Sequence, residues 1–307
     1  MNVLGELAAL TTAVCWAFTS IFFTEAGRRI GSFRVNKIRL LMAVTIYTIV
    51  IILTTGRLFS AQLTWTHVFY LGISGLFGLV LGDSAGFKAM VMIGPRLSSV
   101  VFASAPVMAT IIAWIFLGEI LHPVDLLGIS VTVGGIAWVV LERRFSQSNN
   151  LAAGHPDAGS KAKGVFMALI AAFGQATGLI LAKYGMLRVG AEIAPMDASY
   201  IRMLTALAAI WIISAARRNL RPTIVAMKDR KAMTFALGGA FFGPFLGVWM
   251  SLVAVRIIPA GIAATLNAMT PILIIPAVIV IYKEKVSVRA ILGAVVAVLG
   301  VAILMLT

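Results

Sequence analysis

Two acidic residues, Asp83 and Glu6, stand inside long apolar stretches of the chain. An ionised carboxylate is costly in hydrocarbon unless it is paired or wet, so such residues are functional candidates. Asp83 follows Gly82 near the end of a stretch over 67–88, and Glu6 lies one turn into the first stretch. Either carboxylate is therefore a candidate for proton coupling. The alternative for Asp83 is structural, as an interfacial cap or as the partner of Lys88.

Uncharged polar and aromatic side chains form a second set of candidates, for binding a small solute. Trp16, Thr19 and Ser20 follow helical spacing and so share one face of the first stretch. Gln175 stands in the equivalent stretch of the second half, and its amide has four bonding sites to satisfy. We expect the substrate-binding residues to be Trp16, Thr19, Ser20, Gln175, Trp249, Asn267 and Thr270. Each hydroxyl has the alternative of bonding its own helix, and each Trp that of packing only.

The composition indicates that lipid, and not water, surrounds the elements that position these residues. Apolar residues make up 61% of the chain and charged residues 12%, and the mean hydropathy is +1.02. Stretches of about 20 apolar residues, the length that crosses a bilayer, are predicted ten times. They run over 3–24, 34–55, 67–88, 95–117, 122–141, 164–186, 198–216, 232–255, 260–282 and 288–306. The first lacks a basic leading region, so we expect it to be retained as a helix.

The chain also repeats itself at a constant offset of 165. The matching pairs are Gly78 and Gly243, Gly82 and Gly247, Ala89 and Ala254, Pro106 and Pro271, Glu119 and Glu284, Gly128 and Gly293, and Gly135 and Gly300. Arg39 and Arg202 match at a shifted offset of 163. A polar segment over 146–163 separates five stretches from five more. Because five is odd, the halves 1–145 and 164–307 must cross in opposite directions, as in carriers built from inverted repeats.

The sequence thus predicts an all-α integral membrane protein of ten transmembrane helices in two inverted five-helix repeats. Glycines at every fourth position, Gly78, Gly82 and Gly86 in one half and Gly239, Gly243 and Gly247 in the other, predict close helix approach. Prolines within the stretches, Pro106, Pro244 and Pro271 among them, predict kinks or breaks.

The excess of basic residues, 25 against 11 acidic, does not indicate nucleic acid. Twenty of the 25 fall in or beside the loops after the odd-numbered stretches. This asymmetry is the positive-inside signal, which places those loops in the cytoplasm and both termini outside. The sequence shows no grouped carboxylates, metal-ligand cluster, phosphate loop or nucleophile arrangement, so we expect no enzyme activity, no metal and no cofactor.

Several of these features together resemble the EamA-type drug/metabolite transporters. They are the Trp16–Ser20 run, Arg39 and Arg202 opening the second stretch of each half, Pro106 and Pro271, the Glu119 and Glu284 endings, and the Gly-x6-Gly of the last stretches. The resemblance covers essentially the whole chain. It departs where Lys283 replaces a small residue and where no Trp-Gly pair follows Cys15.

The resemblance implies a secondary transporter in the cell membrane that exports a small organic metabolite, an amino acid or a related compound. The alternatives are a multidrug or lipid-like substrate and a non-transporting membrane scaffold. Many relatives have both termini inside, in conflict with the charge asymmetry, and small multidrug relatives carry their essential acid deeper in the first helix than Glu6. The partners expected are the substrate, the bilayer and protons as coupling ion; the sequence leaves monomer and homodimer open.

Overall fold

The computed structural model describes residues 3–142, 158–218, 220–273 and 287–305, and within these ranges all regular structure is helical. The helices of the first half are α1 (Val3–Ile30), α2 (Ser32–Thr55), α3 (Trp65–Gly75), η1 (Leu76–Gly82), α4 (Asp83–Phe102), α5 (Ala105–Leu117) and α6 (Pro123–Glu142). Those of the second half are α7 (Ala158–Leu187), α8 (Pro195–Ala216), α9 (Arg221–Ala226), α10 (Arg230–Ala240), η3 (Phe241–Gly247), α11 (Val248–Ile257), α12 (Ala260–Asn267), α13 (Thr270–Leu273) and α15 (Val288–Met305).

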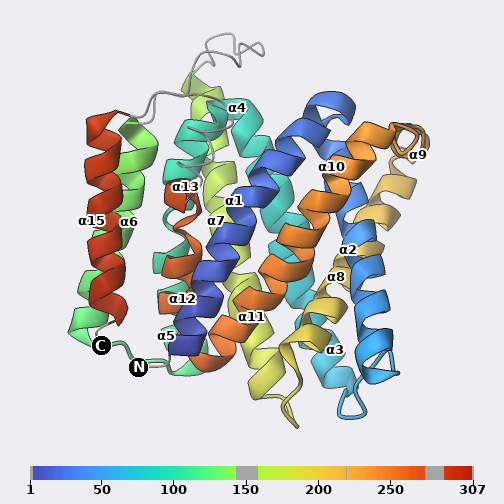
Figure 1. The fold of residues 1–307 in the computed structure, drawn as a ribbon, viewed down its shortest axis with the longest axis horizontal. Coiled ribbons are helices and arrows are strands. Elements are labelled where there is room, and N and C mark those ends of the chain that lie inside the picture. The colour runs from blue at the N-terminus through green and yellow to red at the C-terminus, as the bar shows by residue number, and fades with distance from the viewer. Residues whose placement is uncertain (1–2, 143–157, 219, 274–286, 306–307) are drawn as a thin grey trace.

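The long helices stand side by side, with α6 and α15 at one edge and α2 and α8 toward the other (Figure 1). Among the described residues, 6 helices are long and apolar enough to cross a membrane, and three shorter apolar helices accompany them. The beginning and the end of the chain lie at the same end of the molecule (Figure 1). The chain is therefore an all-helical, multi-pass membrane protein.

The sequence repeat is also a repeat of secondary structure. The π-helical segment η1 and its counterpart η3 begin and end 165 residues apart. The two-residue turn after α4, at 103–104, corresponds at the same offset to the turn at 268–269 after α12. At both places a proline stands at the second position of the next helix, where its missing N–H is tolerated. Pro106 and Pro271 therefore end one helix and allow another to begin.

The glycine stripe of each half packs on the first long helix of the other half. On α7, a Cβ at Gly178 would lie 2.9 Å from the Cα of Gly78, which is closer than a side chain allows. On η3, a Cβ at Gly243 would lie 2.7 Å from the Cγ2 of Thr19 of α1. Small residues permit such contact, and in lipid this close packing replaces the hydrophobic drive between helices. The two halves are thus interlocked.

The helices α6 and α15 form a separate glycine-mediated pair. Gly128 packs on Leu304, whereas Gly293 packs on Val139, so the two helices run antiparallel. A Cβ at Gly135 would lie 2.4 Å from the backbone nitrogen of Ala297. These are the last helices of the two repeats, and they meet at one edge of the molecule (Figure 1).

Two predicted boundaries differ from the observed ones. The third and fourth stretches join, because helix continues from Trp65 through α4 to Phe102. The polar segment over 146–163 is not entirely a linker, because α7 begins at Ala158; its small residues and lysines are compatible with a helix that extends beyond the apolar part. The end of the ninth stretch, with Pro276 and Glu284, lies outside the described residues.

Candidate substrate site

Asp83 is held by an ion pair with Arg39. Asp83 is the first residue of α4, directly after the π-helical segment, and Arg39 reaches it from α2 with one guanidinium nitrogen. Both side chains are almost completely buried, at 4% exposure for Arg39 and 14% for Asp83. The Arg39 Nε also donates to Asn36 Oδ1 at 2.7 Å. Buried charges are retained in proteins when they are paired and hydrogen-bonded in this way.

Lys88, the partner that the sequence suggested for Asp83, is exposed, and that assignment is corrected. Five residues along a helix turn a side chain by roughly 140°, so Lys88 points away from the face that carries Asp83. The partner comes from another helix instead. Which arginine this would be depends on tertiary packing, which the local spacing does not encode.

Gln175 of α7 completes the contacts of Asp83 from the second half of the chain. Its Nε2 donates to Asp83 Oδ1 at 2.8 Å and to the carbonyl oxygen of Gly78 at 3.2 Å. The amide reaches both acceptors because glycines let α7 and η1 approach closely, a Cβ at Gly174 being only 2.8 Å from the carbonyl oxygen of Phe77. Two residues predicted for different tasks, Asp83 and Gln175, are therefore joined by a hydrogen bond in one cluster.

Arg202 of α8 adds a second buried guanidinium to this site. It is 4% exposed, and its Nε has no hydrogen-bond partner. Its Nη2 lies 3.4 Å, and the Gln175 Oε1 3.8 Å, from the position that a Cβ of Gly78 would take. The guanidinium and the amide thus converge on the same glycine.

Neither Arg39 nor Arg202 was among the predicted site residues. Both were counted as charges at the edges of loops, where an arginine is ordinarily solvated. The signal that identifies them is their duplication, because the same residue opens the same apolar stretch in both halves. A buried position in each half is the structural reason for that match.

Aromatic side chains lie next to the charged groups. Tyr47 of α2 donates from its hydroxyl to the carbonyl oxygen of Phe245 at 2.7 Å, and its ring packs on that of Phe245 with the centroids 4.8 Å apart. Trp249 stands 6.1 Å from Phe245 by ring centroids, and Trp16 packs against the same hydrophobic cluster. Both tryptophans are partly buried, so the predicted site residues Trp16 and Trp249 pack against the same hydrophobic cluster.

The two hydroxyl residues of α1 that were predicted to bind substrate donate hydrogen bonds to helix backbone carbonyls. Ser20 is exposed and donates to the carbonyl oxygen of Trp16 at 2.8 Å, in its own helix. Thr19 is buried and donates to the carbonyl oxygen of Gly239 at 3.4 Å. In this conformation both hydroxyls therefore satisfy backbone carbonyls.

Asn267 and Thr270 flank the break between α12 and α13. Thr270 donates to the carbonyl oxygens of Asn267 at 3.1 Å and of Ala13 at 3.3 Å, which ties the break to α1. The Oδ1 of Asn267 is buried without a hydrogen-bond partner among the described residues. A buried amide oxygen in this state is a candidate for a ligand contact.

Glu6 is buried in the first turn of α1, and its Oε2 also lacks a partner among the described residues. Its neighbour Gly5 packs on Ile257 and Ile258, where α11 ends. Glu6 thus lies beside the junction of α11 and α12, and no hydrogen bond between described residues joins it to Asp83. The two acidic candidates occupy different places.

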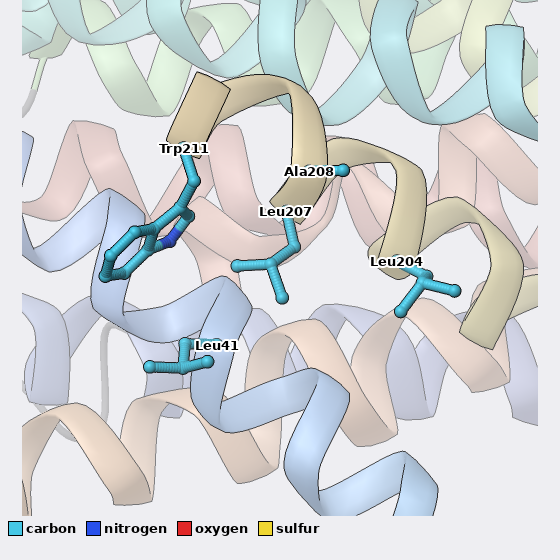
Figure 2. A pocket seen from close by; sticks show the side chains of 5 residues that line it. All are labelled: Leu41, Leu204, Leu207, Ala208 and Trp211. Carbon is cyan, nitrogen blue, oxygen red and sulfur yellow. The ribbon is translucent and has the colours of Figure 1, made fainter. Parts of the chain in front are cut away.

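An apolar hollow of about 270 Å³ lies between α2 and α8. Figure 2 shows Leu41 of α2 facing Leu204, Leu207, Ala208 and Trp211 of α8. Leu41 and Leu204 are counterparts at the offset of 163, so one pair of equivalent positions from the two halves lines the hollow. Its lining offers almost no polar group, and it is separate from the charged cluster.

The comparisons with known proteins agree with this architecture. The model of the EamA-like transporter family matches twice, over residues 3–141 and 162–306. One solved crystal structure is 16% identical in sequence and has a TM-score of 0.74, with 100% of this chain and 98% of that chain covered, which shows a shared fold. Comparison with curated protein sequences gives no match. The predicted resemblance is confirmed: the chain belongs to the EamA-like transporter family, a family of membrane transporters and not of enzymes.

Proposed function

We propose that the protein is a secondary carrier that moves a small organic metabolite across the cell membrane by alternating access. The observation that carries this proposal is the buried cluster of Arg39, Asp83, Gln175 and Arg202, which takes members from both halves of a membrane-embedded chain. Buried ionisable groups in a membrane protein are candidates for substrate and ion pathways, because their burial is costly.

The mechanism rests on ten crossings in two inverted halves, 1–145 and 164–307, joined around the segment 146–163. The matching element bounds at the offset of 165 and the antiparallel pair of α6 and α15 support this arrangement. Helices related by inversion run in opposite directions, as these two do. Rocking of one half against the other would expose the central cluster to each side in turn.

The substrate that the family and the site favour is an amino acid or a related metabolite, and the direction proposed is export. Charged groups, an amide and aromatic rings beside them suit a compact amphipathic solute better than a hydrocarbon. A multidrug or lipid-like substrate is the second candidate, favoured by the apolar hollow between α2 and α8. A non-transporting scaffold would not need the buried charges.

Purified protein in liposomes tests the proposal, with uptake of a labelled metabolite mixture as the measurement. The wild type should accumulate specific compounds. Gln175→Ala and Asn267→Ala should each lower the rate several-fold at equal protein content, because losing one hydrogen bond to substrate costs about 1 kcal/mol. Thr45→Ala, which removes an exposed hydroxyl bonded to its own helix and outside the predicted site, is the matched control. Empty liposomes and wild-type liposomes that accumulate the same compounds equally would contradict transport.

For proton coupling we propose Asp83, whose carboxylate faces Arg39 of α2 and Gln175 of α7, with Arg202 of α8 and Tyr47 of α2 near it. A proton on this carboxylate would remove the negative charge that holds Arg39. Asp83→Asn should therefore keep the shape of the side chain and flatten the dependence of transport rate on pH. Glu6→Gln is the comparison, because Glu6 lies apart from the cluster. An unchanged pH profile in Asp83→Asn would leave Asp83 as a structural group.

The charge asymmetry makes a prediction about orientation. The basic ends of α1 and the short helix α9 lie at one end of the molecule, opposite to the termini (Figure 1). By the positive-inside rule that end faces the cytoplasm. Ala153→Cys in a Cys15→Ser protein should then resist an impermeant thiol reagent in intact cells and react after lysis. Ready labelling in intact cells would place the termini inside.

A further inference from the structure

The central cluster contains one more positive charge than negative charge. Arg39 is paired with Asp83, whereas Arg202 has no ion-pair partner among the residues that the structure describes. Its Nε is buried without a hydrogen bond, and the nearby Asp83 already accepts from Arg39 and from Gln175. The group of two guanidiniums and one carboxylate therefore carries a formal charge of +1 in a buried place.

A comparison of the two repeats shows that the second half lacks the carboxylate that the first half provides. Asp83 follows η1, and Val248 follows η3 at the same relative position, with the backbone N–H of each residue donating to the carbonyls five and three residues earlier. Arg39 and Arg202 are likewise counterparts. The first half thus supplies its arginine with a carboxylate, and the second half offers a buried valine at the corresponding position.

A buried guanidinium without an ion pair of its own is unfavourable, because its charge has lost water and the nearby carboxylate, Asp83, is already paired with Arg39. Arginine remains charged in proteins, so it cannot escape this cost by losing its proton. The burial of Arg202 becomes favourable when an anion lies beside it, where the second half has Val248 in place of an acidic residue. We propose that Arg202 binds the carboxylate of the transported solute, so that the substrate itself provides the second negative charge.

This assignment deepens the proposed function and rests on it. The planar guanidinium suits a carboxylate, to which it donates two parallel hydrogen bonds. The amide oxygen of Gln175 points toward the same glycine as the Arg202 Nη2 and offers an acceptor to an N–H or O–H group of the solute. Tyr47, Phe245 and Trp249 lie in the hydrophobic cluster next to this place and suit an apolar or aromatic side group.

The first experiment identifies the charge class of the ligand without assuming its name. Protein in lipid nanodiscs is dialysed against a total small-molecule extract of the cells that produce it, and the retained compounds are identified by mass spectrometry. We expect the wild type to retain carboxylates. Arg202→Gln should retain them at least about tenfold less, because a charge-assisted contact is lost, and Arg202→Lys should lie between the two.

The second experiment introduces a carboxylate at position 248, the counterpart of Asp83. Val248→Asp should pair with Arg202, keep the fold and lower carboxylate retention at least about tenfold, because the protein's own acid then competes with the solute. Val248→Asn, of the same shape without the charge, is the matched control and should retain more than Val248→Asp. The double variant Arg202→Gln/Val248→Asp should unfold at a lower temperature than Val248→Asp alone, because its new acid has no partner. The comparison of Val248→Asp with Val248→Asn tests the role of Arg202 even if Arg202→Gln alone fails to fold.

The outcomes separate this assignment from the proposed function. Retention of neutral or cationic compounds, unchanged in Arg202→Gln, would support a transporter and overturn the role of Arg202. Retention of phosphate esters only would show an anion site of a different class and would overturn the carboxylate. A wild type that retains nothing and transports nothing would count against the proposed function, and the assignment would fall with it.

Discussion

Replacing Arg39 by leucine is expected to destabilise the protein by about 3–5 kcal/mol, because Asp83 is then left buried without its guanidinium. Gln175 would still donate to the carboxylate, but a neutral amide does not compensate the charge. Cys15 provides the measurement. It is the only cysteine and is buried, so its reaction with a thiol dye during heating reports unfolding.

The double variant Arg39→Leu/Asp83→Leu distinguishes an ion pair from two independent contributions. Removing both charges should cost much less than the sum of the single variants, because neither charge is left alone. Arg28→Leu is the matched control: its pair with Glu25 is exposed, and its loss should change stability by less than about 1 kcal/mol. Strictly additive losses at positions 39 and 83 would contradict a coupled pair.

Glu119→Gln is expected to open one end of the molecule. Glu119, after the end of α5, lies 2.6 Å by its Oε1 from the Nζ of Lys183 of α7. Its Oε2 accepts from the backbone N–H of Ala260 at 2.8 Å, at the start of α12, and Lys183 also donates to the carbonyl oxygen of Ile258 at 2.9 Å. One carboxylate of the first half thus holds two elements of the second.

Losing this charge should weaken the contacts between Glu119, α7 and α12 by about 3 kcal/mol, because Lys183 remains nearly buried without its counter-ion. The readout is the labelling rate of Ile262→Cys in α12, in a Cys15→Ser background, and about 3 kcal/mol corresponds to an increase of roughly 100-fold. Glu192→Gln breaks the exposed pair with Arg256 and is the control. Equal labelling rates in the Glu119→Gln and Glu192→Gln variants would show that Glu119 does not hold α12 in place.

The hydrogen bond that Ala260 donates from its backbone N–H cannot be repeated at its counterpart in the first half, for a chemical reason. The counterpart of Ala260 at the offset of 165 is Pro95, which has no N–H to donate to a carboxylate. At the other end, α1 and α10 are joined by Arg29 and Asp229, 3.0 Å apart and exposed to water. Exposed pairs contribute little. Among the described residues, the nearly buried pair of Glu119 and Lys183 is therefore expected to contribute more stability than the exposed pair of Arg29 and Asp229.

The sequence by itself determined the membrane class, the family and the repeat. Runs of apolar residues, glycines at every fourth position and prolines are local signals, and the bilayer makes them decisive because lipid cannot satisfy an open backbone. The corresponding bounds of η1 and η3 follow from that repeat. The cost of a carboxylate in hydrocarbon singled out Asp83, and the four bonding sites of an amide singled out Gln175.

Only the tertiary structure decided which of these groups meet. Asp83 pairs with Arg39, 44 positions away in the sequence, and Gln175 joins it from the other half. Neither contact follows from spacing, since each depends on how closely α7 approaches η1 and on which face of α2 turns inward. Arg202 also depends on the tertiary structure: the repeat supplies an arginine in each half, but valine stands at position 248, where the first half has Asp83, and the Arg202 Nε is buried without a hydrogen bond.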